Sequence, residues 1–342
     1  MASRATIEHR EPAIPVEKDP DILAAAARLA GEDMCSVSDL SSGEVRAILK
    51  LGHDVKRNPR EYRHALDAKQ MVLMFEKASL RTRMSFEAGI NTMGGNAIFV
   101  DHTNSPLGER ESICDVARNV ERWVDIIVLR TYAHDTITEM AANARVPVVN
   151  ALSDFEHPCQ ALADFMTLQE HFGTVSGMNF TYVGDGNNVC HSLMITGAQL
   201  GANVTIATPR GYSPDIEIVT IARDMAQANN CELRLTQDPQ AAAENADAIY
   251  TDVCVSMGFE HESTKRAPIF RPFQVNEALM QKAASHAVFM HCLPARRNDE
   301  VTDAVIDGAQ SIVFDQAENR LHTQKALLLL LLGGLANIPS FQ

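Results

Sequence analysis

Short apolar runs alternate with amphipathic stretches along most of this chain of 342 residues. In the first half the runs are residues 71–75, 96–100, 125–131 and 147–152. The second half repeats the scheme at residues 179–185, 203–209, 247–253, 287–293 and 311–316. This alternation predicts β-strands connected by α-helices, an arrangement that produces parallel sheets. We therefore predict an α/β protein with two domains, each a parallel sheet flanked by helices.

The segments between the apolar runs carry helix signals. The helix predicted at residues 157–173 has Pro158 at its first position and Gly173 at its end, which are favoured start and stop residues. We predict that this helix, with the helix at the C-terminus, joins the two domains. Residues 1–33 form an N-terminal extension in this interpretation, with a short helical stretch near residues 22–29.

Composition narrows the possible functions. The chain has 44 acidic and 30 basic residues, a formal net charge of −14 and no Lys/Arg block, which disfavours a nucleic-acid surface. Seven cysteines without a CxxC pair predict reduced thiols rather than a disulfide framework or a zinc knot. The longest aliphatic run, residues 327–332, is far shorter than the roughly 20 residues of a membrane span, and the acidic N-terminus resembles no signal peptide. We expect a cytoplasmic protein that binds a small ligand.

Positive charge is concentrated in the stretch FEKASLRTRMSFEAG, which includes the end of the first apolar run. Ser79, Arg81 and Thr82 stand at the predicted start of a helix, where unpaired N–H groups and the helix dipole favour anions. A guanidinium adds a bidentate grip on phosphate or carboxylate. Arg83 lies on another helix face and can pair with Glu87. Capping hydroxyls with surface arginines are an equally weighted alternative.

Further polar residues follow predicted strands in the first half. Arg130 ends an apolar strand, where burying a guanidinium is costly unless something negative accompanies it. His157 and Gln160 stand at the start of the helix at 157–173, and a neutral imidazole and a primary amide can hydrogen-bond a carbonyl oxygen and an amide. A structural salt bridge for Arg130 and a capping role for His157 remain open alternatives.

The second half offers a candidate site for an ammonium group. Asp252 and Ser256, with Met257, follow a predicted strand and supply a carboxylate and a hydroxyl, although a turn with a capping aspartate is the alternative. Cys292 follows the next strand, where an inert core cysteine is the ordinary case. Arg320 opens the terminal helix and places one more arginine at a helix start.

The loop VGDGNN, residues 183–188, is similar to a dinucleotide-binding turn. The third glycine of that fingerprint would fall at Val189, and the next strand ends in Thr208 and Pro209 where a ribose-binding acid is expected. No P-loop occurs in the sequence, and no His/Cys/carboxylate cluster has metal-ligand spacing. We therefore predict no cofactor and no metal.

A set of motifs, in order over about residues 35–335, resembles those of the ornithine carbamoyltransferases. They are SLRTR (79–83), LRT (129–131), HPCQ (157–160), GDGNN (184–188), DVCVSMG (252–258), HCLP (291–294) and ENRLHTQKA (318–326). The resemblance implies transfer of the carbamoyl group of carbamoyl phosphate to the δ-amine of L-ornithine, giving L-citrulline and phosphate. This reaction serves arginine biosynthesis or, in reverse, arginine catabolism.

The resemblance also implies residue roles. The carbamoyl phosphate-binding residues would be Ser79, Leu80, Arg81, Thr82, Arg130, His157, Gln160, Cys292, Leu293 and Arg320. Catalysis would fall to Arg130, His157, Cys292 and Arg320, and ornithine binding to Asn188, Asp252, Ser256 and Met257. Within this scheme Arg130 and His157 lie near the carbamoyl oxygen and Gln160 lies near the carbamoyl amide.

The same resemblance implies the organisation of the protein. Residues 34–167 would be the carbamoyl phosphate-binding domain, with a C-terminal helix at 320–338 packed back on it, and residues 168–319 the ornithine-binding domain. The protein would be a homotrimer with active sites at subunit interfaces. One departure is Pro106, which stands where the family usually has Gln or His reaching a neighbouring subunit's carbamoyl phosphate. Proline has no side-chain donor, so that contact is absent or replaced.

Two alternatives stay open at this point. One is a carbamoyltransferase for a modified acceptor, such as N-acylornithine or putrescine, although a blocked α-amine would gain nothing from Asp252. The other is a catalytically silent subunit that binds anions and regulates a partner.

Overall fold

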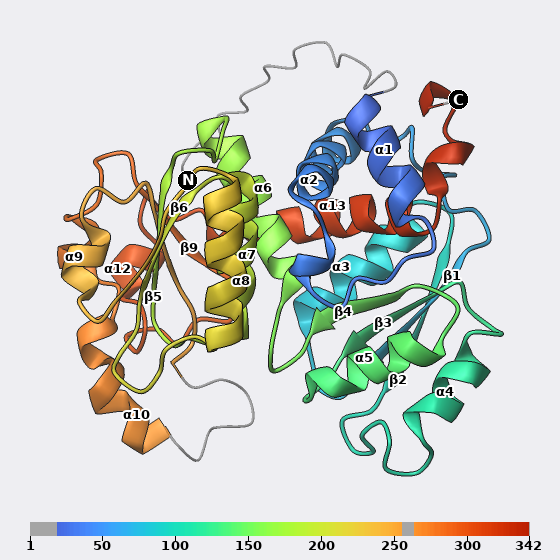
Figure 1. The fold of residues 1–342 in the computed structure, drawn as a ribbon, viewed down its shortest axis with the longest axis horizontal. Coiled ribbons are helices and arrows are strands. Elements are labelled where there is room, and N and C mark those ends of the chain that lie inside the picture. Colours follow the sequence, from blue (N-terminus) through green and yellow to red (C-terminus); the bar gives the residue numbers. More distant parts are fainter. Residues whose placement is uncertain (1–18, 255–262, 342) are drawn as a thin grey trace, which may run out of the picture.

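The computed structural model describes residues 19–254 and 263–341, which form two α/β units side by side (Figure 1). Within these residues the first unit holds a four-stranded sheet with the strand order β2-β1-β3-β4, and the second a five-stranded sheet with the order β7-β6-β5-β8-β9. All strand pairs within the two sheets are parallel. The fold class predicted from the alternating pattern is confirmed.

The first unit consists of a sheet with helices on both faces. Its strands are β1 (Gln70–Phe75), β2 (Asn96–Asp101), β3 (Ile126–Arg130) and β4 (Val148–Leu152). Its connecting helices are α3 (Leu80–Asn91), α4 (Ile113–Val120) and α5 (His134–Asn143). β3 and β4 are buried along their whole length, which explains why they are continuous apolar runs rather than alternating ones.

The second unit repeats this arrangement. Its strands are β5 (Asn179–Val183), β6 (Asn203–Ala207), β7 (Leu233–Thr236), β8 (Ala248–Thr251) and β9 (Val288–His291). Its helices are α7 (Asn188–Leu200), α8 (Ile216–Ala228), α9 (Pro239–Ala243), α10 (Ser263–Phe270), α11 (Glu277–Met280) and α12 (Asp303–Ile306), with the short η3 (Arg271–Phe273). α7 is the most deeply buried of these helices, since it packs against α6 as well as α8.

Two long helices connect the units, as the sequence predicts. They are α6 (Pro158–Phe172) and α13 (Val313–Leu331), which pack closely on each other. α13 also packs on α2 (Ser42–Arg57) and α3, so the end of the chain returns to the first unit (Figure 1). One apolar core therefore continues from the first sheet through these helices into the second. No helix in the described residues is long and apolar enough to cross a membrane.

The ends of the described chain also pack on the first unit. α1 (Pro20–Leu29) lies on α2 and α13, with Ile22 and Leu29 fully buried. The short helices η1 (Val37–Asp39), η4 (Gly334–Asn337) and η5 (Pro339–Phe341) complete this side of the unit. The helical stretch expected near residues 22–29 is therefore present.

One predicted strand is absent from the structure, and one observed strand was not predicted. The apolar run at residues 311–316 is not a strand: only Ser311 bridges to Phe289, and α13 begins two residues later. β7 was not predicted, because its half-exposed sequence LRLT carries a charged residue among its apolar ones. Both differences lie at or beside an edge of the second sheet: partial exposure weakens the apolar signal of β7, whereas the 311–316 run is apolar because it leads into the buried helix α13.

Strand order also fixes where a ligand can bind. In the first sheet the connection from β1 goes to one side, to β2, and then to the other, to β3. In the second sheet the same reversal occurs between β5 and β8. Such reversals leave a crevice outside the carboxyl ends of the two strands, which is the usual ligand site of an open α/β sheet.

Candidate active site

A cavity of about 400 Å³ lies where the two crevices face each other. Every predicted site residue in the described part of the chain lines it: Ser79, Leu80, Arg81, Thr82, Arg130, His157, Gln160, Asn188, Asp252, Cys292, Leu293 and Arg320. The predicted residues Ser256 and Met257 lie outside the described residues. Residues more than 200 positions apart in sequence thus line the same cavity, for example residues 79–82 and Arg320.

The loop after β1 forms one wall of this cavity. Ser79 caps α3, and its hydroxyl accepts a hydrogen bond from the Thr82 N–H at 3.2 Å. Arg81 faces the cavity, whereas Arg83 donates to Glu87 at 2.9 Å and lies 3.8 Å from the centre of the Phe99 ring. The predicted pairing of Arg83 with Glu87 is confirmed, and Arg81 lines the cavity.

Two more guanidinium groups approach the same space. Arg130 is 5 % exposed and Arg320 is 2 % exposed, yet within the described chain neither forms an ion pair with a carboxylate. The salt bridge weighed for Arg130 is therefore not found among these residues. Burial, followed by the charge of Arg320, lowers the pKa of Arg130 to about 9. Because buried like charges destabilise one another, this arrangement calls for an anionic ligand.

His157 stands between these arginines at the start of α6. Burial lowers the pKa of the His157 imidazole well below 6.5, and the charges of Arg320 and Arg130 lower it further. The ring is therefore neutral at physiological pH and can donate one N–H. The loop is held in place because the His157 backbone N–H donates to the Ser192 hydroxyl at 2.9 Å.

Gln160, one turn further along α6, connects the arginines to the loop after β1. Arg320 Nη1 donates to Gln160 Oε1 at 2.5 Å, and Arg320 Nη2 donates to Thr82 Oγ1 at 3.2 Å. The Gln160 amide nitrogen donates in turn to Asp164 at 2.7 Å. These bonds fix the Arg320 and Gln160 side chains before any ligand binds, which favours tight and specific binding.

The opposite wall carries a carboxylate, Asp252, as well as one cation, Arg296. Asp252 follows β8, and its Oδ2 accepts from Asn187 Nδ2 at 2.8 Å. Its Oδ1 accepts from the Cys292 thiol at 3.0 Å. Burial, followed by the charge of Asp252, raises the pKa of Cys292 well above 9, so the sulfur remains a protonated thiol. A nucleophilic thiolate at Cys292 is excluded under ordinary conditions.

The turn after β9 brings backbone groups to the cavity. The Leu293 N–H donates to His291 Nδ1 at 2.8 Å, which leaves His291 Nε2 to donate to Glu300 at 3.3 Å. Leu293 has a φ of 56°, a left-handed conformation that costs a non-glycine residue about 1–2 kcal/mol. Strain of this kind commonly marks a functional turn.

Asp252, His291 and Cys292 also form a potential metal-ligand set, with ligand atoms within 4.8 Å of one another. Their hydrogen bonds are internal, since Cys292 donates to Asp252 and His291 accepts from Leu293. A metal would have to displace a proton from a thiol whose pKa is strongly raised. The prediction of no metal stays a prediction.

Several residues that the sequence patterns did not indicate hold the predicted site residues in place. Asn187 caps α7 and binds Asp252, and Asp164 binds Gln160. Glu76, which is 3 % exposed, accepts from the Leu107 and Tyr132 N–H groups and so ties the loop containing Pro106 to the end of β3. The spacing of Asp164 four residues after Gln160 on one helix was a signal for the second pair.

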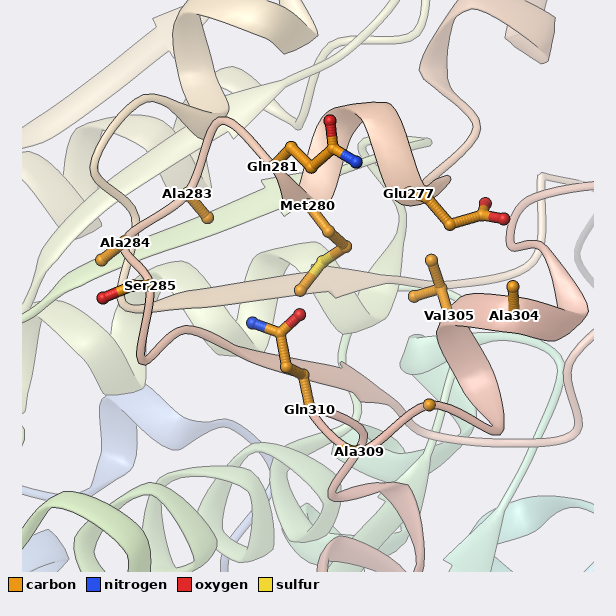
Figure 2. A pocket seen from close by; sticks show the side chains of 11 residues that line it. Glu277, Met280, Gln281, Ala283, Ala284, Ser285, Ala304, Val305, Ala309 and Gln310 are labelled. Carbon is orange, nitrogen blue, oxygen red and sulfur yellow. The ribbon is translucent and has the colours of Figure 1, made fainter.

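A second cavity, of about 440 Å³, lies in the second unit beside α11 and α12. Figure 2 shows Met280 and Gln310 facing each other across it. Glu277 is the one ionisable side chain in its described lining, and its carboxylate accepts from the Thr302 hydroxyl at 2.8 Å. The second cavity therefore lacks the grouped reactive side chains of the first.

Family models match both halves of the chain. Residues 32–170 match the carbamoyl-P binding domain of aspartate/ornithine carbamoyltransferases, and residues 176–331 match the Asp/Orn binding domain. The ornithine carbamoyltransferase of Pyrococcus horikoshii is 48% identical over 309 residues, which are 90% of this chain and 98% of that protein. The enzyme of the same name from Shewanella oneidensis is 50% identical over 296 residues, covering 86% and 98% of the two chains.

Solved structures agree with these sequence matches. The ornithine carbamoyltransferase of Pyrococcus furiosus superposes with a TM-score of 0.87 at 47% identity, covering 90% of this chain and 98% of that one. The Thermus thermophilus structure of the same name has a TM-score of 0.79 at 44% identity, covering 87% and 98%.

Proposed function

This chain belongs to the aspartate/ornithine carbamoyltransferase family and is a carbamoyltransferase acting on ornithine, and we propose that the cavity between its two sheets performs the transfer. The δ-amine of ornithine attacks the carbonyl carbon of carbamoyl phosphate, a C–N bond forms, and the C–O bond to phosphate breaks. The δ-ammonium loses two protons in total: one leaves on phosphate as its monohydrogen dianion, and one goes to solvent. The products are L-citrulline and phosphate.

The wall after β1 binds the phosphate in this proposal. Arg81 and Arg320 supply charge-assisted hydrogen bonds, and Ser79 and Thr82 add hydroxyl and backbone donors at the start of α3. The same cations stabilise negative charge on the departing phosphate. Leu80 contributes its backbone N–H, since its side chain is 74% exposed.

Arg130 and neutral His157 stabilise the oxygen of the carbamoyl group. Negative charge develops on this oxygen as the amine attacks, and donors held in place beforehand lower the barrier without having to reorganise. Gln160 Oε1 and the backbone at Cys292 and Leu293 bind the carbamoyl amide. The reaction needs no covalent enzyme intermediate, and the protonated Cys292 thiol is consistent with that.

The opposite wall binds ornithine. Asp252 attracts an ammonium group and Asn188 offers an amide, with Ser256 and Met257 assigned to the same role from the sequence alone. The δ-ammonium, with an ordinary pKa near that of lysine at roughly 10.4, must lose a proton before it can attack. Holding the amine against the carbamoyl carbon supplies a large part of the rate.

One observation carries these assignments: three guanidinium groups line one wall of the cavity, while the other wall holds the carboxylate of Asp252 together with Arg296. The test measures the carbamoylated product formed from carbamoyl phosphate with ornithine, N-acetylornithine, putrescine or aspartate as acceptor. Turnover with ornithine alone is the expected result. Preference for another acceptor would overturn the assignment of Asp252, and no turnover with any of them would favour a silent anion-binding subunit.

We also propose a homotrimer with subunit contacts beside the phosphate loop. Leu80, Met84 and Ile98 are 74%, 56% and 48% exposed; the first two lie on α3 and the third on β2, and Leu80 also lines the cavity. The loop with Pro106 does not line the cavity of its own subunit, which is compatible with reaching a neighbour's. Light scattering of the purified protein should give three times the chain mass, and a monomer mass would refute the proposal.

The domain boundaries are proposals of the same kind. Residues 34–167 are assigned to carbamoyl phosphate and 168–319 to ornithine, with the C-terminal helix returning to the first domain and residues 1–33 as an extension. The separate sheets support this division, although α13 begins at Val313 and α1 already packs on the first unit. A cytoplasmic location is proposed because all seven cysteines are free thiols.

A further inference from the structure

Asp164 is a buried carboxylate to which no step of the reaction assigns a role. It lies on α6 one turn beyond Gln160, and its side chain is 0 % exposed. Its Oδ1 accepts two hydrogen bonds, from Gln160 Nε2 and from Gln316 Nε2, both at 2.7 Å. A carboxylate kept at this depth needs a reason, because burial disfavours its charge.

The hydrogen bond from Gln160 determines how its amide is oriented. An ionised carboxylate only accepts, so it must face the Nε2 end of the glutamine. The Oε1 end is thereby turned toward Arg320 and the cavity. The amide group of carbamoyl phosphate has two N–H donors and needs an acceptor, and Gln160 Oε1 is then oriented to provide it.

The hydrogen bond from Gln316 extends the same network to the second unit. Gln316 Oε1 accepts from the backbone N–H of His291 at 3.0 Å, at the end of β9. That residue directly precedes Cys292 and Leu293, whose backbone also faces the cavity. Asp164 thus joins Gln160 to the turn after β9.

We propose that Asp164 is a positioning residue that makes the site select acyl phosphates, and their phosphonate analogues, that carry an N–H group, by fixing Gln160 as an acceptor. The proposal rests on the function proposed above. It extends that function from the residues that touch the ligand to one that acts on the ligand only through Gln160.

The charged surroundings of Asp164 are consistent with this role. Burial raises its pKa to about 7, while hydrogen bonds from Gln160, Gln316 and Tyr250 and the charge of Arg320 oppose the rise. The Cys292 thiol also lies near enough for the two groups to affect each other. Asp164 Oδ1 can accept the hydrogen bond from Gln160 in both protonation states, because a protonated carboxyl group still has an acceptor oxygen.

Direct binding tests the proposal without depending on turnover. Phosphonoacetamide and acetonylphosphonate are stable probes that differ by an amide NH₂ in one and a methyl group in the other. Calorimetry should show that the wild-type protein prefers the amide. In Asp164→Leu the amide probe should bind about 10- to 100-fold more weakly, while the methyl probe and inorganic phosphate change by less than about threefold.

Two further variants separate positioning from general damage. In Asp164→Asn the side-chain oxygen can still accept from both glutamines, so the preference should remain within about threefold of wild type. In a Gln160→Met background, Asp164→Leu should cost less than about threefold, because the residue through which Asp164 acts is absent. Asp164→Ala replaces Asp164→Leu if the latter does not fold, as judged by thermal unfolding.

Equal weakening of all three probes in Asp164→Leu would overturn the proposal, since it indicates a purely structural role. An unchanged preference would overturn it as well, as would an undiminished effect in the Gln160→Met background. The proposed function fails separately, through absence of citrulline formation by the wild-type protein.

Discussion

The two walls of the cavity differ in the charged side chains that they present. The wall of the first sheet gathers Arg81, Arg130 and Arg320 with a neutral imidazole, and within the described residues no carboxylate pairs with the two buried guanidiniums. The wall of the second sheet places Asp252 against a thiol and an amide, with each oxygen hydrogen-bonded. Both walls use the carboxyl ends of parallel strands at a reversal of strand order.

The contrast explains how one cavity can accommodate both a negatively charged group and a positively charged group. The cationic wall is held by hydrogen bonds but not neutralised, so part of its electrostatic energy is released only when a dianion binds. Both oxygens of the Asp252 carboxylate in the anionic wall are hydrogen-bonded. We therefore expect a doubly negative phosphate and a positively charged amine to bind at different walls, with the reacting atoms between them.

The largest expected effect comes from the cationic wall. Arg81→Ala should lower kcat/KM for carbamoyl phosphate about 10³-fold, because a charge-assisted donor to the leaving phosphate is lost. Arg83 lies two residues away and is paired with Glu87, so Arg83→Ala should change kcat/KM for carbamoyl phosphate by less than about threefold. Steady-state kinetics with varied carbamoyl phosphate measure both. Similar losses in the two variants would contradict the distinction between ligand-facing and paired arginines.

A substitution in the anionic wall should have a smaller effect, and it should change KM for ornithine rather than kcat/KM for carbamoyl phosphate. Asp252→Asn should raise KM for ornithine about 10- to 100-fold while leaving KM for carbamoyl phosphate nearly unchanged, because a charged hydrogen-bond acceptor is lost. Asp238→Asn, at the exposed cap of α9 on the same sheet, serves as the control. If Asp252→Asn affected the carbamoyl phosphate constant as strongly, the two walls would not act separately.

The smallest effect is expected where the helices between the walls meet. Burial alone would raise the pKa of Glu170, but hydrogen bonds from His53, Asn319 and Lys56 outweigh it and lower the pKa to about 2. A carboxylate with a lowered pKa stabilises the fold above its ordinary pKa of 4.5, and that stabilisation is lost as pH falls toward 2. Since the group is partly exposed, Glu170→Gln should cost only about 1 kcal/mol at pH 7.

Thermal unfolding of Glu170→Gln at several pH values measures this cost. The difference from wild type should shrink as the pH is lowered through 4.5, with little change in kinetics. Glu318→Gln, whose carboxylate is 3.9 Å from Lys56 and more exposed, should show a smaller difference. A difference that persists or grows at low pH would contradict the assigned cause.

Much of this protein could be predicted from local patterns. The alternation of apolar runs and helices predicted the parallel sheets, and the residues after the strands predicted the site, because strand ends collect at one edge. The run at residues 311–316 failed as a strand because it begins the buried helix α13, and apolar content alone does not distinguish a short strand from a buried helix. β7 was missed because an edge strand alternates polar and apolar residues.

By itself, the sequence determined which chemical groups stand at the ends of strands and at the starts of several helices, since those depend on neighbours along the chain. The prediction that Arg320 opens the terminal helix was wrong, because α13 already begins at Val313 and Arg320 lies inside it. Only the tertiary structure decided that the two crevices face each other, that Arg130 and Arg320 share a chamber, and that Asp164 holds Gln160 and Gln316 together. These relations depend on how α6 and α13 pack between the sheets. Packing of this kind is set by the combined shapes of many side chains far apart in sequence, and no short motif encodes it.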